Sequence, residues 1–99
     1  MPEIPENNYN TLVQAPRNLF VLGQISCNEG GRGSISCAVT AANGEVRKIQ
    51  VSAHYYRRSD SQIQFNALTM PVLAGEQFKV DATETYKSIV TKFWTVDWA

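Results

Sequence analysis

Residues 66–80 read NALTMPVLAGEQFKV, and this stretch indicates the fold of the chain. Apolar residues end an extended segment at 68–70, Pro71 follows, and a turn centred on Ala74-Gly75 leads to a segment that alternates at Phe78 and Val80. Proline within sheets is confined to edges and strand ends, and glycine is common in tight turns. The stretch therefore predicts a buried β-hairpin.

The segment 87–99, KSIVTKFWTVDWA, predicts a final strand with apolar residues on both faces. Ile89, Thr91, Phe93 and Thr95 share one face, and Val90, Lys92, Trp94, Val96 and Trp98 share the other. A strand that is apolar on both sides is typical of a buried position, so we expect it in the middle of a sheet.

Two earlier segments present apolar residues of the same parity. Leu19, Val21, Ile25 and Cys27 precede a glycine-rich turn, and Ile35, Cys37, Val39 and Ala41 follow it. A turn centred on Arg32 would pair these segments and place Cys27 directly across from Cys37. The two cysteines would then form a disulfide in an oxidising compartment or stay as buried free thiols in a reducing one.

A second hairpin is predicted at residues 42–44, Ala-Asn-Gly, because glycine in the last position suits a three-residue turn. This turn keeps Ile49, Val51 and Ala53 on the face of Cys37. No segment of helical length repeats apolar residues every three to four positions. We therefore expect an all-β fold: an antiparallel, jelly-roll-like β-sandwich of seven to eight strands, formed by residues 9–99, with residues 1–8 as a tail or linker.

The composition of the chain argues against several classes of function. The 99 residues carry no net charge, and the nine basic ones are dispersed along the chain, which argues against a polyanion groove and a nucleic-acid partner. We recognise neither an export signal nor a membrane-spanning segment, so we expect synthesis in the cytoplasm and no membrane insertion. A role outside the cell would then place the protein in a virion or an extracellular particle.

Catalytic chemistry is not indicated. His54 is the one histidine, the acidic residues are scattered, and the cysteines fall on an apolar face where a thiol is inert. Metal sites need several converging ligands. We expect no enzyme activity, no metal and no cofactor.

The polar residues are better interpreted as a binding site than as a catalytic one. An aromatic ring can cover the C–H groups of a sugar, and a guanidinium suits its acidic groups. The candidate ligand-binding residues are His54, Tyr56, Arg57, Arg58 and Asp60, with Tyr86 before the last strand. The alternative is an ordinary solvated loop.

The second half of the chain resembles a known group of head domains. The matching residues are Leu68, Pro71, Val72, Gly75, Glu76, Phe78 and Val80, followed by Phe93, Trp94, Val96 and Trp98. They resemble the jelly-roll heads related to tumour necrosis factor and the complement-type head, and especially the small trimeric heads of bacteriophage tail fibres. Upstream, residues 17–19, Arg-Asn-Leu, depart from the Ser-Asp-Gly of that pattern.

The resemblance implies a homotrimer whose last strands meet near the threefold axis. An exposed cluster of Trp94, Val96 and Trp98 with Val90 would exceed the apolar patch that soluble monomers usually carry, which favours burial against other subunits. The alternative is that residues 1–14 of the same chain cover this face. We expect a non-enzymatic, receptor-binding head that recognises a surface carbohydrate as a homotrimer. The alternatives are a structural or assembly protein without its own ligand and, least favoured, a monomeric lectin.

Overall fold

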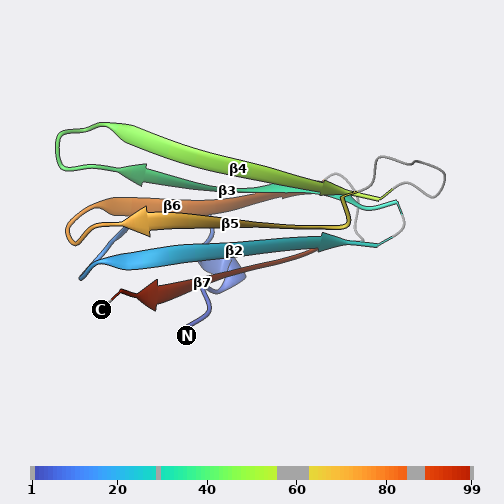
Figure 1. Cartoon of the computed structure of the whole chain (residues 1–99), viewed down its shortest axis with the longest axis horizontal. Helices are drawn as coiled ribbons and strands as arrows, with labels where there is room; N and C mark the ends of the chain where they lie inside the picture. Colours follow the sequence, from blue (N-terminus) through green and yellow to red (C-terminus); the bar gives the residue numbers. More distant parts are fainter. Residues whose placement is uncertain (1, 29, 56–62, 85–88, 99) are drawn as a thin grey trace.

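The computed structural model describes residues 2–28, 30–55, 63–84 and 89–98. Within these ranges the chain forms seven strands and one short 3-10 helix, η1 (Glu6–Asn8). One sheet has the order β1-β6-β3-β4, with β1 (Val13–Gln14), β6 (Gln77–Glu84), β3 (Arg32–Thr40) and β4 (Val46–His54). The other has the order β5-β2-β7, with β5 (Phe65–Val72), β2 (Leu19–Cys27) and β7 (Ile89–Asp97) (Figure 1). All pairs are antiparallel, which confirms the predicted sandwich.

The strand pairs are nested. β3 pairs with β4, β2 pairs with β5, and β1 pairs with β6, so the chain runs as one long hairpin wrapped over two layers. This wrapping is characteristic of a jelly roll, and β7 is added beside β2. The central strands are therefore β2 in one sheet and β6 and β3 in the other.

The core lies between the two sheets. Along each strand, buried and more exposed residues alternate, as expected when one face of each sheet meets the other. Its fully buried large side chains are Phe93, Ile25, Ile35, Val21, Val39, Val72 and Cys37. Burying one aliphatic or aromatic side chain of this size contributes roughly 1.5–3 kcal/mol, so this layer is the main source of stability.

The hairpin at residues 42–44 is confirmed. Thr40 pairs with Val46, and the Ala41 N–H donates to the Glu45 carbonyl oxygen at 2.8 Å. Gly44 has a φ of 88°, the left-handed conformation that the last residue of such a turn requires. The predicted face follows, because Cys37 pairs with Ile49.

The predicted hairpin at residues 66–80 is wrong. The turn exists, with Gly75 at a φ of 88° and the Glu76 N–H donating to the Leu73 carbonyl oxygen. However, β5 pairs with β2, and β6 pairs with β1 and β3, so the turn carries the chain from one sheet to the other. The apolar residues on both sides of the turn then face each other across the core.

The predicted pairing of Cys27 with Cys37 is also wrong. Cys27 lies on β2, where it pairs with Ile89, and Cys37 lies on β3 in the opposite sheet, between Ile49 and Val80. Both thiols are buried and free. Their shared parity correctly predicts that both cysteines face the core, but they face it from two different sheets.

The last strand lies at an edge of its sheet, not in the middle as predicted, because β7 pairs with β2 on one side only. Its outer edge meets residues 2–14, which we call the strap. The Ile4 N–H donates to the Phe93 carbonyl oxygen at 2.8 Å, and the Thr95 N–H donates to the Pro2 carbonyl oxygen at 3.2 Å.

The strap continues from β7 to the other sheet. The Asn10 N–H donates to the Val80 carbonyl oxygen at 2.7 Å, and β1 then pairs with β6. The Tyr9 ring packs edge-on against Phe93 with their centroids 5.0 Å apart. Residues 2–8, expected as a tail or linker, therefore begin along β7, and the later part of the strap reaches β6 in the other sheet.

Candidate functional site

The outer face of the β5-β2-β7 sheet is apolar at the end that holds Phe20 and Leu22. Phe20 lies between Pro71 and Val96 in one cross-strand row, and Leu22 lies between Thr69 and Trp94 in the next. Beyond the end of β7, the ring of Trp98 stacks on Phe20 with centroids 5.2 Å apart. The next row, Gln24 with Ala67 and Lys92, separates these residues from Val90 and Phe65, which are 54% and 56% exposed at the other end of the sheet. We call this surface the apolar face.

The four predicted interface residues are on this face: Val90, Trp94, Val96 and Trp98. The strap runs beside this face, since Glu3 pairs with Trp94, and its side chains Ile4 and Tyr9 pack against the core. Phe20 and Leu22 were not predicted as part of the surface. The sequence did contain a signal for them: residues 19–22 are all apolar, so this strand carries apolar side chains on both of its faces.

The outer face of the other sheet is polar and holds His54. A hollow of about 380 Å³ opens there, and its polar lining is Arg32, Ser34, Gln50, Ser52, His54 and Thr83. The register explains the gathering, since Arg32 pairs with His54, and Ser34 lies between Ser52 and Thr83. These residues come from the β3–β4 hairpin and from β6, which lies later in the sequence.

Of the predicted ligand-binding residues, the structure places only His54. Its backbone pairs with Ile63 through two hydrogen bonds, of 2.8 and 3.1 Å, which fixes the end of β4 beside the hollow. The other candidates lie outside the described residues: Tyr56, Arg57, Arg58, Asp60 and Tyr86. Sequence reasoning missed Arg32 because it placed that residue in a turn, although the hairpin at residues 42–44 pairs Arg32 with His54. Thr83 could not be found in this way, because β6 pairs with β3 from a distant part of the chain.

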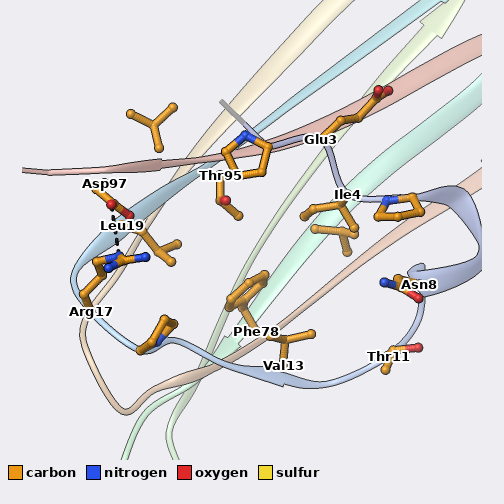
Figure 2. A pocket seen from close by; sticks show the side chains of 15 residues that line it. Glu3, Ile4, Asn8, Thr11, Val13, Arg17, Leu19, Phe78, Thr95 and Asp97 are labelled. Carbon is orange, nitrogen blue, oxygen red and sulfur yellow. Dashed lines mark ion pairs between the residues drawn. The ribbon is translucent and has the colours of Figure 1, made fainter.

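A cavity of about 580 Å³ lies under the strap (Figure 2). Its apolar lining includes Ile4, Val13, Leu19, Phe78, Val80 and Val96. An exposed ion pair, Arg17 Nε to Asp97 Oδ2 at 3.0 Å, lies at one end, and Asn8 and Thr11 lie at the other. The cavity can hold apolar groups. Three charged residues line it: Arg17 and Asp97, which pair with each other, and Glu3.

The most strongly bonded carboxylate is structural. Glu76, 7% exposed, accepts hydrogen bonds from both terminal nitrogens of Arg47 at 2.7 and 3.0 Å and from the Leu73 N–H at 2.8 Å. These bonds lower the pKa of Glu76 to about 2 and raise the pKa of Arg47. Arg47 also donates to the Pro71 carbonyl oxygen. The pair ties β4 to the turn between β5 and β6.

The cysteines do not resemble nucleophiles. Burial raises the pKa of Cys27, and it raises the pKa of Cys37 to about 12. A thiol is reactive as the thiolate, so neither is activated at neutral pH. Within the described part of the chain, no three His, Cys, Asp or Glu residues come together as a metal site. No helix of that part is long and apolar enough to cross a membrane.

Comparison with known proteins finds no family model that matches the chain and no significant match among curated proteins or solved structures.

Proposed function

We propose that the protein is a non-enzymatic receptor-binding head module that works as a homotrimer and recognises a surface carbohydrate, as part of a virion or extracellular particle. The contrast between its two outer faces carries this proposal. One face presents aromatic and aliphatic side chains, and the other presents hydroxyl, amide and basic groups. Because the faces lie on opposite sheets, subunit contact through one leaves the other open to a ligand.

The apolar face supports self-association. Trp94 and Val96 are half-buried, and Trp98 is 36% exposed, within a surface that also contains Phe20 and Leu22. Apolar surface buried against another subunit contributes about 25 cal/mol per Å², and a stable interface buries roughly 800 Å² on each partner. The threefold symmetry rests on the resemblance to trimeric tail-fibre heads.

The polar hollow supports carbohydrate binding. Sugar hydroxyls need donors and acceptors at fixed positions, and strands hold side chains more rigidly than loops do. Ser34, Ser52 and Thr83 supply hydroxyls, Gln50 supplies an amide, and His54 supplies a ring.

The mass in solution tests self-association. Light scattering should give three times the chain mass, and Val96→Asp should lower it because a charge is buried in the interface. Val46→Asp is the matched control, since Val46 is 65% exposed on the polar sheet and should keep the wild-type mass. A wild-type monomer at micromolar concentration would contradict the trimer, even if the variant failed to fold.

A glycan panel tests ligand binding. Ser52→Trp should fill the hollow and abolish binding, whereas Asn43→Trp in the exposed hairpin turn should not. Equal binding by both variants would refute this site. Tyr56→Ala and Arg58→Ala test the predicted neighbouring loop in the same assay.

A structural or assembly protein of a fibre or particle is the second candidate. It is favoured because, among the described residues that line the hollow, only His54 has a ring with which to cover a sugar. This candidate predicts the loss of mass in Val96→Asp and no binding to any glycan of the panel.

A further inference from the structure

The register gathers basic side chains on the outer face of the β6-β3-β4 sheet. Lys48 and Lys79 flank Ala38 in one cross-strand row. Arg32 projects from the same face at the other end of β3, beside His54. These bases looked dispersed in the sequence, but three strands bring them onto one surface.

This surface carries a positive excess. Among the outward-facing residues that the structure describes on β3, β4 and β6, Asp81 is the one acidic side chain against three permanent cations. The whole chain has no net charge, so acidic groups are concentrated elsewhere. Glu3 pairs with Trp94 of β7, and Asp97 lies on β7 itself, so both belong to the opposite sheet. A surface with an excess of one sign attracts ligands of the other.

The shape of the face suits an extended ligand. From Arg32 to Ala38, β3 spans about 20 Å at roughly 3.3 Å per residue, with the basic groups at both ends. Between them lie two rows of polar groups: Ser34 with Ser52 and Thr83, and then Ser36 with Gln50 and Asp81, the one acidic side chain of the described face. The hollow described above opens at the Arg32 end.

We infer that this face binds an acidic polysaccharide lying along β3. Its carboxylate groups would meet Arg32 at one end and the two lysines at the other, and its hydroxyls would bond the serines and Gln50 between them. Guanidinium and ammonium groups form their strongest hydrogen bonds with such anions. Single-stranded nucleic acid is disfavoured, because it needs stacking platforms and the only ring on the described part of this face is His54.

This inference rests on the proposed carbohydrate-binding function and specifies its ligand. Wild-type protein is titrated with polygalacturonate, neutral dextran and single-stranded DNA at low and physiological salt. We expect polygalacturonate to bind, to weaken with salt, and to bind better than the other two. Arg32→Gln, Lys48→Gln and Lys79→Gln should each weaken it about two- to fivefold, the range for exposed ion pairs. Arg17→Gln, the same charge change beside the strap, should not.

Each other outcome overturns the inference in a distinct way. Equal binding of dextran would show a carbohydrate site without charge preference, and the proposed function would stand. Tighter binding of DNA would identify a nucleic-acid surface. Equal weakening by Arg17→Gln would show a non-specific charge effect. If polygalacturonate, dextran and the whole glycan panel all fail to bind, the inference and the carbohydrate-binding proposal fall together.

Discussion

Gly23→Ala tests the packing at the centre of the sandwich. Gly23 lies in the middle of β2 and pairs with Leu68 on β5 and Phe93 on β7. A methyl group there would lie 2.8 Å from Phe93 Cε1 and 3.0 Å from Leu68 Cγ, whereas ordinary contacts are 3.4–4 Å. Both neighbours are buried, and Tyr9 packs against Phe93, so neither can move freely.

Two effects of opposite sign decide the magnitude. Replacing glycine by alanine in ordinary extended backbone stabilises a protein by about 0.4–1 kcal/mol, because the unfolded chain loses freedom. Overpacking a dense core costs about 1–3 kcal/mol. The close approach involves two buried side chains, so the second effect should win, and we expect Gly23→Ala to lower the free energy of unfolding by roughly 0.5–2 kcal/mol.

Urea denaturation at fixed protein concentration, followed by tryptophan fluorescence, measures this change. Gln24→Ala, exposed on the same strand, is the control and should change stability by less than about 0.5 kcal/mol. In a Phe93→Leu background, which removes the ring, Gly23→Ala should cost at least about 0.5 kcal/mol less than in the wild type. An unchanged or raised stability of the single variant, or strict additivity of the two changes, would refute the steric argument.

Three further predictions concern other parts of the molecule. The pKa of Glu76 is lowered from 4.5 to about 2, so its contribution to stability is complete above pH 4.5 and disappears as the pH falls toward 2. The urea midpoint of Glu76→Gln should therefore lie below wild type at pH 7 and converge with it near pH 2, while that of Glu45→Gln stays close to wild type throughout. Val13→Phe should fill part of the cavity under the strap and raise stability by roughly 0.5–2 kcal/mol, whereas Leu12→Phe, outside the cavity, should not; equal effects would contradict this. Iodoacetamide at pH 8 should leave Cys37 unmodified in the native protein, as read by mass spectrometry, and labelling as fast as in urea would disprove its burial.

The sequence predicted which residues face the core, because alternation is a local property of a strand. Val39 and Ile35 are buried, and Trp94 and Val96 are on the outer side of β7, as their parity required. The turn at Gly44 was also predictable, since its conformation depends on adjacent residues. The fold class followed from these local patterns.

Strand pairing could not be predicted in the same way. A hairpin and a crossover between sheets place the same residues, such as Met70 and Phe78, toward the core. Parity alone does not distinguish them, so the turn at Gly75 and the pairing of Cys27 with Cys37 were both misread. Which strands pair with each other depends on which sheet edges are open, and that is a property of the whole fold.

In the candidate surfaces, too, local features could be predicted from the sequence, whereas neighbours from distant strands could not. His54 was identified as an outward-facing polar residue, but Arg32 was misassigned to a turn, and Thr83 comes from a strand that only the register brings beside β3. Trp94 and Trp98 were identified as part of one cluster, but Phe20, which stacks on Trp98, completes it from a distant part of the chain.

The position of β2 has a consequence for synthesis on the ribosome. Both neighbours of β2, β5 and β7, are translated after it, and β7 is the last strand described. Until they emerge, a nascent chain carries β2 with two open edges and apolar residues on both faces, a form that pairs readily with other chains. We therefore expect soluble yield to depend on slow translation or chaperone capacity more than on the stability of the finished protein.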